Sequence, residues 1–260
     1  MYSDAHLHLY DYFTARRGKF ELPPDITVCA SAYDPEEFIW QEAFSRQFSE
    51  RVFLSFGIHP QVFASGNSGS DSVEFLKKLL DEKRIVAIGE CGFDLYDRTF
   101  RATLEEQRRV WDIQVDAALR LELPLIIHCR KALHLLFADS RRLKEIKAVI
   151  FHGWPGSLRE AESFLNRGVN AFFCAGKGLL RGDKSLMETI AGLPANRILT
   201  ETDAPYMKLR GEPFSSPDDI RKVAAAVARL RGCTEIEVVE SAYAVFMSLF
   251  ATGRGVPPAR

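Results

Sequence analysis

Residues 123–130 read LPLIIHCR, a short apolar run that ends at His128. Continuous apolar runs of this length are typical of parallel strands that are buried on both faces. In α/β barrels the carboxyl ends of such strands carry the functional side chains. A histidine directly after so apolar a run therefore marks this end of the predicted strand as a candidate site.

The same arrangement recurs four more times along the chain. His6 and His8, Glu90, His152 and Asp203 follow the apolar runs Tyr2–Ala5, Ile85–Gly89, Ala148–Phe151 and Arg197–Thr202. Further runs start near Ile26, Val52 and Val169, which makes eight in all, and charge-rich amphipathic segments lie between most of them. Alternating strands and helices predict a parallel sheet. We expect an α/β fold, a single-domain (β/α)8 TIM barrel with its site at the strands' carboxyl ends.

The chain length of 260 residues suits one such barrel. We expect the barrel to span residues 1–251 and a frayed C-terminal tail to span 252–260. Asp34-Pro35 predicts a helix start, with an N-cap and a proline at the first helical position. Pro217 predicts a second start in the same way. The Gly/Ser-rich segment Ala64–Ser72 is expected to be a loop.

Composition limits the classes of partner and compartment. The net charge of −1 and pI near 6.6 give no global positive field, so a nucleic-acid substrate would have to be held locally. Five cysteines without a CxxC pair favour reduced thiols. No apolar run approaches the length of a membrane span, and the N-terminus lacks a signal-peptide pattern. We expect a cytoplasmic protein that does not bind membranes, with no obligate protein partner evident.

His6 and His8 predict a metal site. Side chains at i and i+2 of a strand point to the same face, so both imidazoles should face the barrel mouth. Imidazole and carboxylate ligands suit a borderline divalent cation, and Glu90 and Asp203 arrive from other strands. In isolation, the HxH pattern is about equally well explained by histidines that only cap a strand; the two carboxylates favour ligands.

A second cluster is predicted on neighbouring strands, from His128, His152 and Glu90. The two oxygens of a carboxylate make Glu90 the natural bridge between two metals. A buried glutamate is costly unless it is coordinated or hydrogen-bonded. The glycines around it, Gly89 and Gly92, are expected to leave room for a cation or ligand.

Three carboxylates are candidate catalytic residues: Asp203, Glu90 and Glu201. Asp203 would take a proton from the attacking water. Glu201, two residues earlier on the same strand face, would support a ligand or handle protons. A purely structural carboxylate explains Glu201 equally well.

Five further side chains are candidate substrate-binding residues. His59 follows a strand, and with Arg130 and Arg210 it would hold a phosphate. Trp154 or Tyr206 would stack on a terminal base. Lys131 and Lys177 are expected either in an anion-binding rim or as solvated surface charges.

Taken together, these segments resemble the TatD family of metal-dependent hydrolases, in the amidohydrolase superfamily. The resemblance runs from HLH at 6–8 through GIHP at 57–60, GECGFD at 89–94, LPLIIHCR at 123–130 and FHGWPGS at 151–157 to ETDAPY at 201–206. It implies an eight-stranded barrel with two divalent metals (Zn, Mg, Mn or Ni). One would be held by His6, His8, Glu90 and Asp203, and the other by Glu90, His128 and His152. Family members include exonuclease-type DNases and deacylases of mischarged tRNA.

The chain departs from the family pattern beside the predicted ligands. Lys131, Gly153 and Trp154 stand where the family usually has Asp, Cys and Phe. None of these positions is a predicted ligand, so the departures alter the substrate rim and leave the metal centre complete.

Three functions follow, in order of preference. The first is a phosphodiesterase or deoxyribonuclease that uses a metal-activated water on single-stranded DNA ends or on a small phosphodiester. The second is a carboxyl-ester or amide hydrolase, such as a D-aminoacyl-tRNA deacylase, in which the same water attacks a carbonyl. The third, a non-catalytic binding protein on a vestigial barrel, is disfavoured because every predicted ligand position is filled.

Overall fold

The computed structural model describes residues 1–48, 50–66 and 68–251. Eight parallel strands form one sheet in chain order, so each strand pairs with the next along the sequence. They are β1 (Tyr2–Leu7), β2 (Ile26–Ala32), β3 (Val52–Phe56), β4 (Ala87–Asp94), β5 (Leu125–Arg130), β6 (Val149–Phe151), β7 (Ala171–Ala175) and β8 (Ile198–Thr200). All eight predicted strands are present, and each begins at or shortly after the expected residue.

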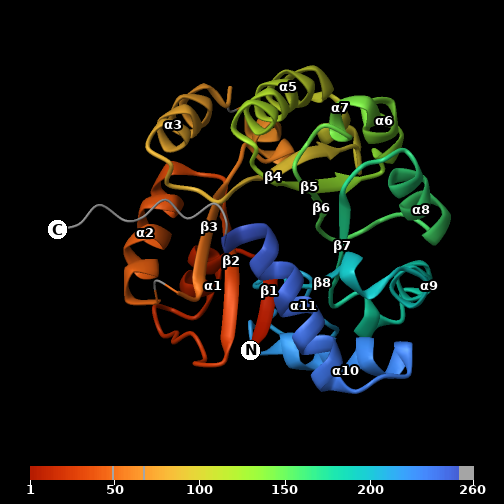
Figure 1. Ribbon diagram of the computed structural model, residues 1–260. Coiled ribbons are helices and arrows are strands. Elements are labelled where there is room, and N and C mark those ends of the chain that lie inside the picture. Colours follow the sequence, from red (N-terminus) through yellow and green to blue (C-terminus); the bar gives the residue numbers. More distant parts are fainter. Residues whose placement is uncertain (49, 67, 252–260) are drawn as a thin grey trace.

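The first and last strands lie side by side and bring the sheet to near closure. The amide of Asp203 donates to the carbonyl oxygen of His6 (3.0 Å), and that of His8 donates to the carbonyl oxygen of Ala204 (2.8 Å). The Thr200 hydroxyl donates to the carbonyl oxygen of Ser3 at 2.6 Å. Helices surround this sheet, as Figure 1 shows. The predicted TIM barrel is thereby confirmed.

Helices follow most strands and run back along the outside of the barrel. They are α1 (Leu9–Ala15), α2 (Pro35–Ser45), α3 (Ser70–Asp81), α4 (Arg98–Arg101), α5 (Leu104–Leu121), α6 (Leu133–Ala138), α7 (Ser140–Leu143), α8 (Leu158–Asn166), α9 (Lys184–Gly192), α10 (Asp219–Arg231) and α11 (Glu235–Phe250). The predicted start of α2 is confirmed, because the Asp34 carboxylate accepts hydrogen bonds from the Glu36 and Glu37 amides.

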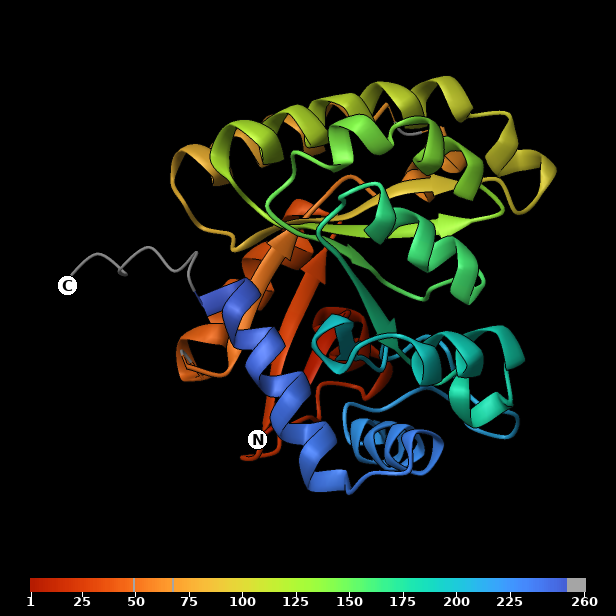
Figure 2. The same ribbon diagram turned by 45° about the vertical axis from the view of Figure 1, so that its right-hand side comes forward.

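The barrel interior is closed at the end where the strands begin. Inward-facing side chains such as Phe53 and Ile126 form a core with Phe246 and Phe250 of α11. The rings of Phe53 and Phe246 lie 5.3 Å apart, centroid to centroid. Figure 2 shows α11 across this end of the molecule. With one end filled by apolar packing, the opposite end is left as the place for a site.

Two sequence expectations about helix starts are wrong. Pro217 precedes α10, whose N-cap is Asp218, so this proline lies outside the helix. The expected loop Ala64–Ser72 is shorter than predicted, because α3 already begins at Ser70. The division of the chain after residue 251 stays a prediction, since the tail 252–260 lies outside the described residues. Within the described part, no helix has the length and apolar character needed to cross a membrane.

Candidate metal centre at the barrel mouth

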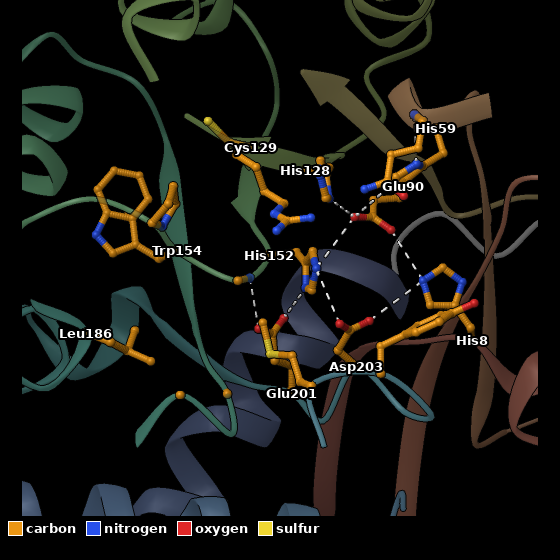
Figure 3. A pocket seen from close by; sticks show the side chains of 18 of the residues that line it. His8, His59, Glu90, His128, Cys129, His152, Trp154, Leu186, Glu201 and Asp203 are labelled. Atoms are coloured by element: carbon orange, nitrogen blue, oxygen red, sulfur yellow. Dashed lines mark hydrogen bonds and ion pairs between the residues drawn. The ribbon is translucent and has the colours of Figure 1, made fainter. Parts of the chain in front are cut away.

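Six predicted metal ligands meet at the mouth of the barrel, as Figure 3 shows for five of them. They are His6, His8, Glu90, His128, His152 and Asp203, and each is less than a tenth exposed. The apolar runs of the sequence predict all six at strand ends. His6, Glu90 and His128 lie within β1, β4 and β5, which continue past them.

Glu90 is at the centre of the cluster. Its carboxylate is faced by five histidine nitrogens: His6 Nε2 at 3.2 Å, His8 Nε2 at 3.3 Å, His128 Nδ1 at 2.8 Å, His59 Nε2 at 3.5 Å and His152 Nε2 at 3.5 Å. His6 and His8 face Oε2, whereas the other three face Oε1. The two oxygens therefore address two separate groups of imidazoles, as a bridging carboxylate would.

The glycines around Glu90 serve a purpose that the sequence analysis did not anticipate. A Cβ on Gly89 would meet the backbone of Ile126 on β5, with its carbonyl oxygen only 2.5 Å away. Gly92 packs equally closely on the backbone of His128. These glycines make room for the neighbouring strand, which brings His128 within reach of Glu90.

Asp203 completes the first group of ligands. Its Oδ1 lies 3.6 Å from His6 Nε2 and 3.8 Å from His8 Nε2. Burial raises its pKa to about 6, against the opposing effect of His152 and His8. The carboxylate is thus close enough to share a cation with both imidazoles and has a pKa suited to proton exchange near neutrality.

Two of the histidines are oriented through their second ring nitrogen. His6 Nδ1 lies 3.0 Å from the Ser31 hydroxyl, and His152 Nδ1 lies 2.9 Å from Glu201 Oε2. The other oxygen of Glu201 accepts a hydrogen bond from the Gly153 amide at 2.9 Å. Metal-binding histidines are commonly fixed by such partners. Glu201 therefore lies where it can position His152.

The ligand atoms around Glu90 form two close groups, and the predicted second cluster stays compatible with them, because His128 Nδ1 and His152 Nε2 face the same carboxylate oxygen, Oε1. His128 is grouped with His59 and Glu90, whereas His152 is grouped with His6 and Glu90. The rings of His128 and His152 are 6.3 Å apart, but those of His59 and His128 are only 4.5 Å apart. His59, which had no expected place in either metal cluster, thus lies among the candidate ligands.

Sequence reasoning missed two buried carboxylates beside the histidines. Asp94 Oδ2 lies 3.1 Å from His128 Nε2 and accepts a hydrogen bond from Gln61 at 2.7 Å. Glu37 Oε1 lies 3.8 Å from His8 Nδ1. Asp94 stands four residues after Glu90 on the same strand, so the two-residue period of a strand could have placed it on the same face. Glu37 lies on α2, and only the fold brings it near.

Charges in the cluster are strongly coupled. Burial opposes ionisation of Glu90, but His59, His6 and His152 hold the pKa of its carboxyl well below the ordinary value. Burial lowers the pKa of His6 to about 4. Burial also opposes protonation of His152, yet Glu201, Asp203 and Glu90 raise its pKa to about 10. The metal-free site thus holds Glu90 ionised and His6 neutral, the forms in which both bind metals, whereas His152 is protonated and would release its proton on binding a metal.

The donor set fits divalent metal ions. His6 Nε2 and His8 Nδ1 are buried and make no hydrogen bond to any described residue. Ligand atoms of His6, His8 and Asp203 all lie within 4.8 Å of one another. The same holds for two sets that include Glu90, which are His6, Glu90 and His152, and His59, Glu90 and His128. Imidazole and carboxylate groups are the ligands that Zn²⁺ and Mn²⁺ commonly take in proteins.

The centre opens into a cavity of about 770 Å³, within the range of sites for small organic ligands. Arg130 lines it, stacked on the Tyr96 ring at 4.0 Å. Tyr206 also lines it and is 46% exposed. Arg181, which the sequence analysis did not single out, is a further lining residue.

Three other residues predicted at the substrate rim are not free to contact a ligand in the cavity or lie outside its lining. Arg210 is exposed but does not line the cavity. Trp154 lines it but is only 4% exposed, and its ring lies 4.8 Å from that of Phe173 and 5.1 Å from that of Phe151. Little of the indole is therefore free to stack on a base. Both interpretations of Lys177 are wrong, because its side chain is fully buried in ion pairs.

A barrel with buried histidines and carboxylates at the carboxyl ends of its strands defines a metal-dependent hydrolase. The comparisons identify the family. The model of the family "TatD related DNase" matches residues 3–251, and the chain belongs to this family. It is a TatD-type metal-dependent hydrolase, as the resemblance of its motifs implied.

Known proteins are similar to this chain in sequence and in structure. The chain is 34% identical over 206 residues to a "3'-5' ssDNA/RNA exonuclease TatD" from Erwinia tasmaniensis, covering 74% of this chain and 76% of the relative. A protein of the same name from Klebsiella pneumoniae is 34% identical over 68% of each chain. The structure of a TatD homologue from Escherichia coli K12 superposes with a TM-score of 0.80 and 25% identity over 98% of each chain.

Proposed function

We propose that this protein is a metal-dependent exonuclease that removes nucleotides from the 3′ end of single-stranded DNA or RNA. The observation that carries the proposal is the position of Glu90, whose two carboxylate oxygens face separate groups of imidazoles at the base of an open cavity. The names of the relatives support the substrate class and the polarity.

Two divalent metal ions are proposed for the centre. His6, His8 and Asp203 would hold one, and Glu90 would bridge it to a second held by His128 with His59 or His152. When bound, such metals lower the pKa of a water molecule and stabilise charge on phosphoryl oxygens.

The protein's own groups then have separate tasks. Asp203 would accept the proton of the attacking water, because its carboxylate lies beside the imidazoles of His6 and His8 that would hold the metal with it. Glu201 would hold His152 in one orientation through Nδ1. Arg130 and Arg181 would bind phosphate oxygens from the rim, since guanidinium groups match phosphate geometry.

Apolar side chains form part of the cavity lining opposite His8 and His59. Trp154 and Leu186 lie there, as Figure 3 shows, and Met207 lines the same cavity. A nucleotide has both a charged phosphate and a flat, weakly polar base, so a half-polar cavity suits it. Among the aromatic side chains that line the cavity, Tyr206 is the most exposed and therefore the best placed to stack on that base. With a net charge of −1, attraction must come from this local rim.

The decisive experiment is a cleavage assay with Mn²⁺ on 5′-labelled single-stranded DNA and RNA, run in parallel with a panel of carboxyl esters. The proposal predicts stepwise shortening from the 3′ end by the wild type and none by Glu90→Gln. Ester cleavage without nucleic-acid cleavage would contradict it and favour the deacylase alternative. Equal activity of wild type and Glu90→Gln would contradict the metal mechanism.

Cytoplasmic residence remains part of the proposal. The five cysteines are free, and four of them are buried. Free thiols suit a reducing compartment.

A further inference from the structure

Lys177 follows β7, and its side chain is fully buried although its neighbours Gly176 and Gly178 line the mouth cavity. Its ammonium donates to Glu212 Oε2 and to Asp219 Oδ2, each at 2.6 Å. Breaking a buried ion pair by removing one partner is strongly destabilising, because it leaves the other charge uncompensated. A buried ion pair therefore holds together the chain segments that carry its charged groups.

Both carboxylates belong to one connection, the segment 201–218 with the first residue of α10. Glu212 Oε2 also accepts a hydrogen bond from the Leu209 amide at 2.9 Å, and Asp219 Oδ2 accepts one from the Ser216 amide at 3.0 Å. Segment 201–218 contains no helix or strand of its own. The two carboxylates therefore organise the backbone of this connection, and Lys177 attaches them to the end of β7.

The beginning of the connection is held by other bonds. The Asp203 amide donates to the carbonyl oxygen of His6, and the Ala204 carbonyl oxygen accepts from the His8 amide. Asp203 is thus fixed to β1 without Lys177. Residues further on are held by single contacts instead: the Ser215 amide donates to the Pro205 carbonyl oxygen (2.9 Å), the Tyr206 hydroxyl donates to Asp11 (2.7 Å), and the hydroxyls of Tyr12 and Ser216 lie 3.1 Å apart. Tyr206 and Met207 of this stretch line the cavity.

Met207 shows how closely this later part covers the site. A Cβ added to Gly153, the residue after His152, would lie 3.0 Å from Met207 Cε. The methionine therefore packs over the end of β6, beside the metal centre. A change in the path of residues 206–216 would move this side chain and alter the shape of the cavity.

We propose that Lys177 is a positioning residue for substrate recognition, which fixes residues 206–216 as one wall of the cavity while the metal centre is positioned independently. Its kinetic consequences rest on the proposed nuclease function. Loss of the ammonium should weaken substrate binding and leave the metal ligands in place.

The test compares Lys177→Met with Lys222→Met. Lys222 contacts the other oxygen of Asp219, at 2.7 Å, but is 61% exposed, which makes it a matched control. In Lys177→Met we expect faster hydrogen exchange at the Leu209 and Ser216 amides and a several-fold higher KM for a labelled oligonucleotide. The kcat and the affinity for Mn²⁺ should not change. Lys222→Met should behave as the wild type.

A second variant tests the proposal if Lys177→Met fails to fold. Lys177→Met combined with Glu212→Gln and Asp219→Asn removes the buried charges together, so none is left uncompensated. It should show the same faster loop exchange and the same rise in KM. Unchanged exchange and KM in either folded variant would overturn the proposal, as would a parallel loss of Mn²⁺ affinity. If the wild type cleaves no nucleic acid, the proposed function fails, while exchange and Mn²⁺ binding still decide the role of Lys177.

Discussion

His152 Nδ1 lies 2.9 Å from Glu201 Oε2, and this contact turns Nε2 of the same ring toward Glu90, 3.5 Å away. Removing the charge of the Glu201 carboxylate should weaken this contact and let the imidazole ring of His152 rotate more freely. We predict that Glu201→Gln lowers the affinity for Mn²⁺ by about 10–100-fold, the usual effect of losing such a partner. Isothermal titration of the metal-free protein measures this, with the exposed Glu188→Gln as control. Wild-type affinity in Glu201→Gln would refute the positioning role.

Metal removal should affect stability as well as activity. Binding to the folded state alone stabilises it by about 2.7 kcal/mol when the free metal is at 100 times its Kd. Chelation should therefore abolish cleavage and lower the Tm, and Mn²⁺ should restore both. Glu90→Gln should show a much smaller metal-dependent shift in Tm. An equal shift in this variant would place the bound metal elsewhere.

Trp154 and Tyr206 should separate into a packing residue and a contact residue. Trp154 is buried among aromatic rings, so Trp154→Ala should cost about 3–5 kcal/mol of unfolding free energy. Tyr206 is 46% exposed and its hydroxyl donates to Asp11 at 2.7 Å, so Tyr206→Ala should cost no more than about 1.5 kcal/mol but raise the KM. Urea unfolding and steady-state kinetics of both variants measure these effects. A stable Trp154→Ala with a raised KM would instead assign base stacking to the tryptophan.

Substituting an arginine near the cavity should affect substrate binding only if its side chain lines the cavity. Arg130→Met and Arg181→Met should each raise the KM for oligonucleotides several-fold and weaken its salt dependence, because each would remove a proposed phosphate contact. Arg210→Met, which changes an exposed arginine outside the cavity lining, is the matched control and should leave both unchanged. A KM effect confined to Arg210→Met would restore that residue to the site.

The Lys177 contact should weaken in acid. Lys177 holds the pKa of Glu212 below its ordinary value of 4.5. The stabilisation is therefore complete above the ordinary pKa and is lost as pH falls through the lowered one. Wild type should be more stable than Glu212→Gln at pH 7, and the difference should shrink below pH 4. Urea unfolding at both pH values tests this. A difference that grows in acid would contradict the pairing.

The sequence predicted the barrel and the side chains that gather at its mouth, because both depend on local patterns. An apolar run followed by a polar residue identifies a strand and its end, and the sheet order then follows from the connections. Glu90 and His128 were found in this way. The spacing of strands could not show that Gly89 and Gly92 serve close strand packing, because that depends on the register of β4 against β5.

Side-chain partners beyond the strands were not predictable from the same patterns. Lys177 follows β7 as regularly as His152 follows β6, yet it turns away from the cavity to meet Glu212 and Asp219. Its partners lie 35 and 42 residues along the chain. Glu212 lies in a connection without helix or strand, and Asp219 is the first residue of α10. The burial of Trp154 likewise depends on packing in the folded chain. The same is true of the short distance between the rings of His59 and His128.

The most direct test of the metal centre around Glu90 is an anomalous difference map from crystals grown with Mn²⁺. We predict two peaks that share Glu90 as a ligand, one also contacting His6, His8 and Asp203, and the other also contacting His128. Peaks that do not contact Glu90, or a map without peaks at the barrel mouth at saturating Mn²⁺, would contradict this prediction.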